Sequence, residues 1–148
     1  MAISFSDSTR KYTPLPIDAD QGFPQSFPVV FGGVTYRFRM YVNASPSLTS
    51  NPSSIFDLPA TEPLIASSIM RPSPDLTRPQ MYLVVRVDRD LPDGKTQTVF
   101  MRKVVPELEY LAGEIALAFP VQRVAVRNLN GTGTFGSKVT GGIATRWV

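Results

Sequence analysis

Glu107, Glu109 and Glu114 come closest in this sequence to the carboxylate pair with which glycosidases carry out acid–base chemistry. Glu107 and Glu109 are two residues apart, so they share a face only if their segment is a β-strand. Nothing in the pattern positions them against an aromatic residue that binds a sugar ring. We therefore interpret all three as solvated charges and expect no glycosidase chemistry.

A glycine run, Gly131-x-Gly133-x-x-Gly136, matches the G-x-G-x-x-G pattern of dinucleotide-binding loops. Such a loop holds a pyrophosphate at the start of a helix that follows the glycines directly. Here a β-patterned segment with further glycines follows, and Ser137 stands where a Walker A loop needs lysine. The run predicts a glycine-rich turn region and no nucleotide site.

Three aspartates, Asp88, Asp90 and Asp93, precede Gly94 at a spacing that resembles a calcium-binding loop. A calcium loop needs oxygen ligands at positions 1, 3 and 5, and position 5 is Pro92. We interpret these aspartates as turn-forming residues.

The chain contains no cysteine and no histidine. This excludes disulfides, metal sites built on Cys or His, thiol nucleophiles and histidine-based triads. Because the remaining motifs fail as well, the sequence predicts a protein that is not an enzyme. We expect no catalytic residue, no cofactor and no metal site.

The composition indicates one folded domain that buries surface on partners. The chain has 148 residues, 43% of them hydrophobic and only 18% charged, with 14 prolines and a net charge of +3. No apolar run approaches the roughly 18 residues of a membrane span, so we expect no membrane partner. The charged residues form no block of one sign, which favours scattered solvated and interface arginines.

Residues 26–42 predict a β-hairpin, because Gly32-Gly33 joins two apolar runs and glycine adopts the positive φ of a tight turn. Pairing Phe31 with Val34 places six apolar residues on one face. These are Phe27, Val29, Phe31, Val34, Tyr36 and Phe38. In this register the missing N–H of Pro28 points away from the partner strand, so we expect residues 26–31 to form an edge strand.

Residues 81–90 and 96–105 predict a second hairpin across Leu91–Lys95. Its register pairs Val87 with Val99 and Val85 with Met101. The fold class is therefore all-β, or mainly β with one short helix: a hairpin-built small barrel or sandwich.

The segment 105–119 fits two secondary structures. Leu108, Leu111 and Ile115 follow a helical stripe, and we favour a short helix through about residue 112 to 117. Leu117 and Phe119 alternate with Ile115, which leaves a strand as the alternative. In the tail, Asn130-Gly131 and Gly141-Gly142 are two further hairpin-turn signals, and Trp147 suggests that the C-terminal end is docked.

We divide the chain into an extended N-terminal arm, 1–25, and a single β domain, 26–148, interrupted by a proline-rich excursion at 43–80. Seven prolines fall in that excursion. A loop of this length without secondary structure is unusual inside a domain and is often functional. We expect the arm to be disordered or laid across a neighbouring protein, and the excursion to wrap over a surface. Deleting 43–80 should then leave the hairpins folded and abolish assembly.

Tyr36, Arg37, Phe38, Arg39 and Tyr41 interleave cations with aromatic rings, as single-stranded nucleic-acid platforms do. In the predicted register, however, Tyr36 and Phe38 face the core and the arginines lie on the other face with Tyr41. A nucleic-acid-binding β module remains an alternative. A β-sandwich that binds glycans or a receptor is another.

Residues 31–43, FGGVTYRFRMYVN, resemble the opening strand of the cyanophage-type baseplate plug family, small virion proteins of contractile-tailed bacteriophages. The family pattern is a β turn followed by G-V-x-Y-R-x-R-x-x-x-N. Its matching residues here are Gly33, Val34, Tyr36, Arg37, Arg39 and Asn43.

This resemblance implies a non-enzymatic structural protein of the virion tail or baseplate, made in the cytoplasm of the bacterial host. Its expected partners are hub, tube or tail-initiator subunits and further copies of itself within the particle, with no nucleic acid and no membrane. Edge strand 26–31 would extend a neighbour's sheet. The residues that we expect at the partner interface are Phe23, Phe56, Leu64, Ile65, Arg37 and Arg39.

Overall fold

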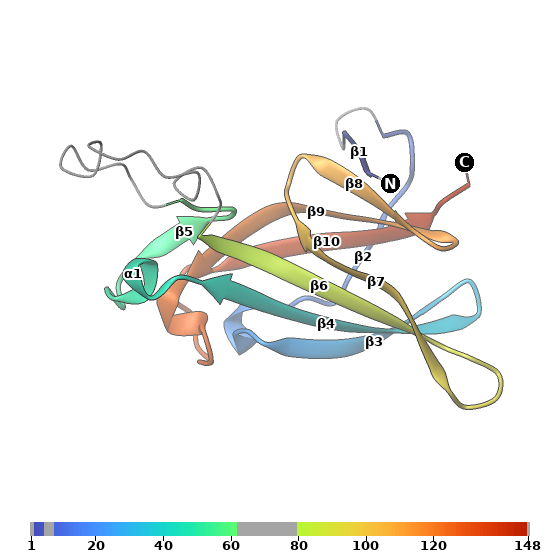
Figure 1. Cartoon of the computed structure of the whole chain (residues 1–148), viewed down its shortest axis with the longest axis horizontal. Helices are drawn as coiled ribbons and strands as arrows, with labels where there is room; N and C mark the ends of the chain where they lie inside the picture. Colours follow the sequence, from blue (N-terminus) through green and yellow to red (C-terminus); the bar gives the residue numbers. More distant parts are fainter. Residues whose placement is uncertain (1, 5–7, 62–79, 148) are drawn as a thin grey trace, which may run out of the picture.

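The computed structural model describes residues 2–4, 8–61 and 80–147, and it shows two antiparallel β-sheets packed face to face as a sandwich (Figure 1). The six-stranded sheet has the order β1-β8-β9-β10-β2, with β5 paired to β9. Its strands are β1 Ala2–Ser4, β2 Thr13–Pro14, β5 Ile55–Asp57, β8 Leu108–Ala112, β9 Ile115–Ala125 and β10 Lys138–Thr145. The all-β prediction is confirmed, in the form of an open sandwich.

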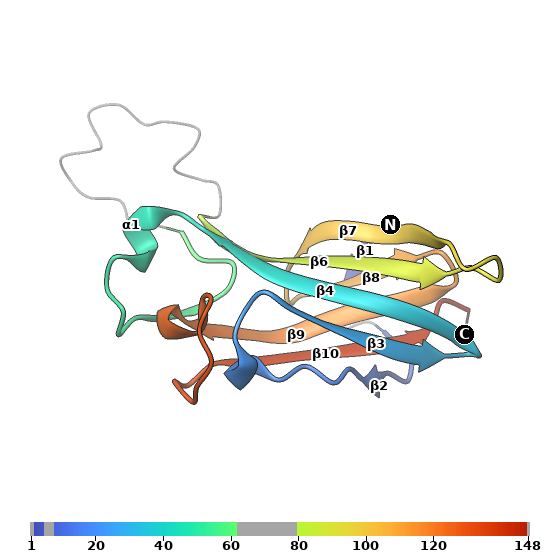
Figure 2. The ribbon, with the colours of Figure 1, turned by 90° about the horizontal axis from the view of Figure 1, so that it is seen from below.

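The second sheet has four strands in the order β3-β4-β6-β7 (Figure 2). These are β3 Gln25–Phe31, β4 Val34–Ala44, β6 Met81–Asp90 and β7 Thr96–Val104. Three short helical segments complete the described elements: η2 Ala19–Gln21, α1 Pro46–Thr49 and η5 Val126–Asn128.

The first hairpin, β3–β4, has the predicted register. Phe31 pairs with Val34 and Phe27 with Phe38, and the rings of Phe27 and Phe38 stack with their centroids 5.3 Å apart. Strand β3 is an edge strand, as Pro28 predicts.

The second hairpin, β6–β7, has the predicted register only next to its turn, where Asp88 pairs with Thr98. A bulge at Val99 then shifts the pairing by one residue, so that Val87 pairs with Phe100 instead. The predicted Val87–Val99 and Val85–Met101 pairs are therefore wrong. The physical reason is core packing: the shift turns Phe100 inward, where it is 6% exposed, and turns Met101 out to solvent.

The predicted helix at about 112–117 is wrong, because this segment forms the end of β8, a turn at Gly113 and the start of β9. The run Ile115–Phe119 is buried on both faces of the sheet. Apolar residues on both faces hide the alternation of a strand and mimic a helical stripe.

Gly141-Gly142 lies in the middle of β10, beside a bulge, and not in a hairpin turn. A Cβ at Gly142 would lie 2.8 Å from Cβ of Tyr12, and a Cβ at Gly141 would lie 2.8 Å from the ring of Phe119. Both glycines are therefore explained by close packing on the two faces of the strand. Asn130-Gly131 does turn, with Asn130 at φ 61°, but inside the long connection from β9 to β10. The C-terminal end is docked through Arg146, whose backbone N–H donates to the Glu114 carbonyl at 2.9 Å and whose carbonyl accepts from Arg10. Trp147 itself is 70% exposed and is not the anchor.

The N-terminal residues that the structure describes pack on their own sheet. Strands β1 and β2 lie at opposite edges of the six-stranded sheet, so the chain between them crosses that sheet (Figure 1). The buried carboxylate of Glu109 marks the crossing and binds Ser8, Arg10 and Tyr12. Arg10 also donates to the backbone carbonyl of Arg146, 2.7 Å away.

Glu109 is thus a structural anchor and not the solvated charge that its sequence context predicts; its side chain is 0% exposed. Burial, and then the hydrogen bond to Glu109, raise the pKa of the Tyr12 phenol, so Tyr12 stays a neutral donor. A buried charge of this kind is tolerated because three donors surround it.

The predicted excursion at 43–80 also begins inside the fold. Leu48 in α1 and Leu58 after β5 belong to the core, at 7% and 3% exposure. Deleting 43–80 would therefore remove core side chains and β5, so the hairpins are no longer expected to survive this deletion. Leu64 and Ile65 lie outside the described residues.

Substituting Gly142 by alanine tests the close approach of Tyr12 to β10. We expect the variant to lose about 1–3 kcal/mol of unfolding free energy, because the new methyl group overlaps Cβ of Tyr12, which is fixed to the backbone. Urea unfolding followed by circular dichroism measures the loss. Thr145→Ala, an exposed position on the same strand, is the control. Equal stability of the Gly142→Ala variant and the wild type would contradict the packing assigned here.

Candidate functional site

The predicted interface residues that the structure describes do not lie on one common surface. Phe23 is 2% exposed, and its backbone N–H and C=O bond Asn128 and Asn130 at 2.8 and 2.7 Å, so Phe23 belongs to the core of this chain. Phe56 in β5 is half-buried against the same core. Arg37 and Arg39 are exposed, and both lie on the outer face of the four-stranded sheet.

The strand edges carry features that oppose strand addition, which argues against the expected sheet extension at residues 26–31. In β3, Pro28 removes a donor from the free edge, and in β7 a bulge at Val99 and the exposed cations Arg102 and Lys103 interrupt it. The six-stranded sheet ends in β1 and β2, which span only three and two residues, and β5, which pairs with β9 alone, spans three. These strand edges therefore carry features that oppose the addition of another strand.

The outer face of the four-stranded sheet is the surface that the described chain leaves uncovered (Figure 2). We call it the outer face below. The registers place these side chains on it: Ser26, Pro28 and Val30 from β3, Arg37, Arg39, Tyr41 and Asn43 from β4, Tyr82, Val84, Arg86, Asp88 and Asp90 from β6, and Thr96, Thr98, Met101 and Lys103 from β7. The outer face thus carries four cationic side chains and two carboxylates.

Two of the cations are held by ion pairs. Arg37 binds Asp90 through two hydrogen bonds of 2.9 and 3.0 Å, which raise the pKa of Arg37 and lower that of Asp90. Arg86 donates to Asp88 at 3.2 Å, and Thr98 donates to the same carboxylate oxygen at 2.7 Å. These pairs are solvent-exposed, so they orient the side chains more than they stabilise the fold.

Arg39 lies directly opposite Arg86 in the register of β4 and β6. Like charges at directly opposed positions of an antiparallel pair are destabilising. Arg86 is held by Asp88 and also donates from a terminal nitrogen to the Thr98 hydroxyl at 3.2 Å. Arg39, in contrast, makes no hydrogen bond or ion pair with any residue that the structure describes. The sheet therefore places two arginines at directly opposed positions, and Arg39 has no anionic partner among the described residues.

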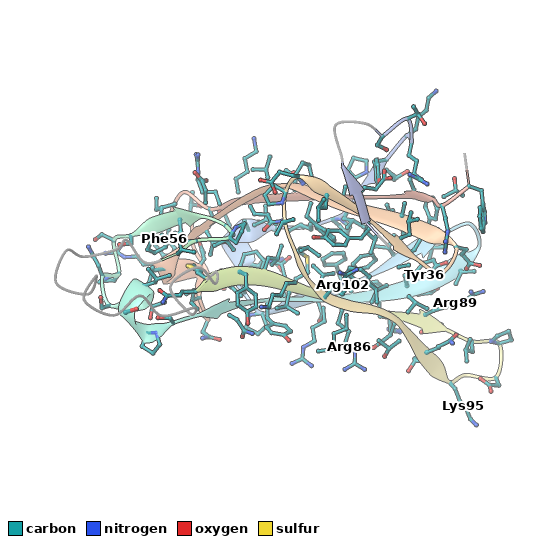
Figure 3. The ribbon with its side chains drawn as sticks, turned by 45° about the horizontal axis from the view of Figure 1, so that its top comes forward. Tyr36, Phe56, Arg86, Arg89, Lys95 and Arg102 are labelled. Atoms are coloured by element: carbon teal, nitrogen blue, oxygen red, sulfur yellow. The ribbon has the colours of Figure 1, made fainter. Side chains whose placement is uncertain are left out.

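A hollow of about 420 Å³ surrounds this arginine pair and is lined by Pro24, Arg39, Tyr41, Arg86 and Met101. A second hollow of about 270 Å³ adjoins it and shares Arg39. Met101 is 54% exposed, so an apolar wall stands beside the two cations. Figure 3 shows Arg86 pointing away from the six-stranded sheet, whereas Tyr36 points between the sheets.

The aromatic residues of the four-stranded sheet offer little free ring surface for stacking. Tyr36 and Phe38 are 2% and 1% exposed and belong to the core, as the predicted register requires. The ammonium group of Lys103 lies 4.3 Å from the ring centroid of Tyr82, and Asn43 donates to the Tyr82 hydroxyl at 3.3 Å. Tyr41 is the aromatic side chain that borders the arginine pair.

A second polar cluster joins the two sheets at one end of the sandwich. The Glu114 carboxylate accepts a 2.6 Å hydrogen bond from Tyr36 and lies 2.8 Å from Arg89. Burial, and then the bond to Glu114, raise the pKa of Tyr36 to about 12. A hollow of about 280 Å³ with Trp147 on its wall adjoins the cluster. The cluster makes Glu114 a contact between the two sheets.

The aspartate and glycine motifs have structural roles. Asp93 accepts from the backbone N–H of Lys95 at 2.9 Å, which is the predicted turn role. The amide of Asn128 donates to the carbonyls of Gly131 and Gly133, which fixes the glycine-rich loop. Across the residues that the structure describes, no group of three or more acidic side chains is placed to hold a metal ion. No described helix is long and apolar enough to span a membrane.

Comparison with known proteins finds no match: no family model, no curated protein and no solved structure is similar to this chain. The resemblance over residues 31–43 therefore rests on those residues alone.

Two residues of this face, Arg86 and Met101, were not predicted from the sequence. The alternation of residues in β6 places Arg86 on the outer side of its strand. Its pairing with Arg39 depends on the register between β4 and β6, and 36 residues separate these two strands in the sequence. Met101 was placed on the wrong face because no sequence signal marked the bulge at Val99.

Arg39→Gln tests whether the arginine pair is under repulsion. We expect the substitution to raise the free energy of unfolding by about 0.2–1 kcal/mol at low salt, because it removes a like charge opposite Arg86. Added salt should diminish the gain. The matched control is Arg37→Gln, on the same strand and face, which loses its bond to Asp90 and should gain nothing. A loss of stability in the Arg39→Gln protein would contradict the interpretation.

The pH dependence of unfolding tests the Tyr36–Glu114 contact. A phenol whose pKa rises from 10.0 unfolded to about 12 folded stabilises the protein fully below pH 10, and this contribution disappears as the pH rises toward 12. Tyr36→Phe should therefore flatten the stability profile between pH 10 and 12. The ultraviolet difference titration of wild type against this variant should show one phenol ionising near pH 12. A phenol that ionises near pH 10 would exclude the contact.

Proposed function

We propose that the protein is a non-enzymatic structural component of a bacteriophage tail or baseplate, close to the hub or tube, and that its outer face docks on another tail subunit. The proposal joins the resemblance over residues 31–43 to the geometry of the four-stranded sheet. Its partners are hub, tube or tail-initiator proteins, and its place is the virion.

One observation carries the proposal: the polar residues of the family pattern, Arg37, Arg39 and Asn43, are all exposed along the outer face of β4. Tyr36, the aromatic residue of the pattern, points the other way and binds Glu114. The pattern thus combines an inner residue that joins the two sheets with an outer row that is exposed to solvent.

The composition of the outer face supports protein docking. Arginine, tyrosine and methionine are enriched at the centres of protein interfaces, and all three line the hollow around Arg39. Val30, 72% exposed, adds an apolar side chain to the same face. Because the strand edges oppose pairing, side chains and not backbone would make the contact.

The nucleic-acid alternative is less well supported. A single-strand platform needs exposed rings on which successive bases stack. Tyr36 and Phe38 are buried, and Lys103 already covers the ring of Tyr82. The glycan alternative would use the hollow beside Trp147, where Tyr36 and Arg89 already occupy the carboxylate of Glu114.

The test is incorporation into particles of the phage that carries the gene. The wild-type protein should copurify with tails at a fixed stoichiometry, measured by mass spectrometry of gradient-purified virions. Arg39→Glu should reduce incorporation at least tenfold, since it reverses a charge at the centre of the docking face. Lys95→Glu, the same charge change at the exposed tip of the β6–β7 hairpin, should incorporate normally (Figure 3).

Absence of the wild-type protein from purified virions would refute the proposed function outright. Normal incorporation of the Arg39→Glu protein, with its fold intact by circular dichroism, would exclude the outer face as the docking surface.

A further inference from the structure

We infer that the Arg39–Arg86 pair is a receptor for one carboxylate side chain, an Asp or Glu of the docking partner, seated beside an apolar residue that fills the hollow against Met101. The inference rests on the proposed function and specifies the chemistry of the partner's surface.

From the general rule for opposed like charges, we expect the arginine pair to be unfavourable in the isolated chain and to become favourable with an anion between its members. Arg39 and Arg86 are cross-strand neighbours, and Arg39 has no anionic partner among the described residues. Guanidinium groups bind carboxylates through directed, charge-assisted hydrogen bonds. One carboxylate would satisfy Arg39 and screen its repulsion from Arg86 in a single contact.

The neighbouring contacts prepare Arg86 for this role. Asp88 and Thr98 hold its Nε and one terminal nitrogen, at 3.2 Å each, from the side of the β6–β7 turn. No hydrogen bond to a described residue engages the other terminal nitrogen, Nη1, which leaves it available as a donor. Arg86 thus enters the contact already oriented, which lowers the entropy cost of binding.

The surroundings favour a protein carboxylate over the phosphates of a nucleic acid. A phosphate backbone brings a row of charges, and its continuation along the face would meet the carboxylates of Asp88 and Asp90. A single acidic side chain avoids them. The hollow of about 420 Å³ also offers Pro24, Tyr41 and Met101 to an apolar neighbour of that side chain. An acidic residue beside an apolar one, presented by a folded partner, fits both features.

Site-specific photocrosslinking tests the inference in the full-length chain. A benzophenone amino acid replaces Met101 in one variant and Val30 in another, and each protein is irradiated in cells in which the phage assembles. We expect both positions to crosslink to one tail protein, at a peptide with Asp or Glu beside an apolar residue. Arg39→Glu should reduce the crosslink at least tenfold, and Lys95→Glu should leave it unchanged.

The decisive step is a charge swap. Replacing the acidic residue of the crosslinked peptide by arginine should abolish the crosslink to wild type and restore it to the Arg39→Glu protein. Restoration supports the inference.

The other outcomes overturn it in distinguishable ways. A crosslink to a tail protein that is indifferent to the charge at residue 39 leaves the docking function standing and excludes the carboxylate contact. A crosslink to nucleic acid, or none to any tail protein, excludes both the carboxylate contact and the proposed docking.

Discussion

The fold depends on a buried ion pair that holds the N-terminal residues against one side of the sandwich. The other side of the sandwich has no cover among the described residues. Glu109, at 0% side-chain exposure, binds Arg10, and Arg10 in turn bonds the backbone just after β10. Removing one partner of such a pair leaves an uncompensated buried charge and costs about 3–5 kcal/mol. The N-terminal residues are therefore committed to the outer side of the six-stranded sheet. The described chain provides no equivalent cover for the four-stranded sheet.

This asymmetry explains where the sequence and the fold disagree. In the core, local preferences agree with the structure: apolar residues alternate along β4, and the diglycine turn closes the β3–β4 hairpin. On the outer face, Arg39 opposite Arg86 breaks the rule for cross-strand pairs without a gain in the isolated chain. Conflicts of this kind are expected where a surface is selected for binding and not for stability.

The sequence predicts what local patterns determine. Gly32-Gly33 and Pro28 were sufficient to give the register and the edge position of β3. Three features depend on distant contacts and could not be read locally: the strand at Ile115–Phe119, which is covered on both faces, the bulge at Val99, and the crowding of Gly142 by Tyr12. The arginine pair belongs to the same class, because the β4–β6 pairing follows a long intervening segment.

The proposed docking through a sheet face would have a consequence that docking through a strand edge lacks. An edge offers backbone groups that any strand can bind, and it invites self-association without limit. Pro28 and the bulge at Val99 block that route in the four-stranded sheet. The outer face offers instead a fixed arrangement of cations, with Arg37 and Arg86 oriented by Asp90 and Asp88 and Arg39 between them. A partner that docks on this face as we propose would have to match this arrangement of charge side chain by side chain, which would select one docking geometry.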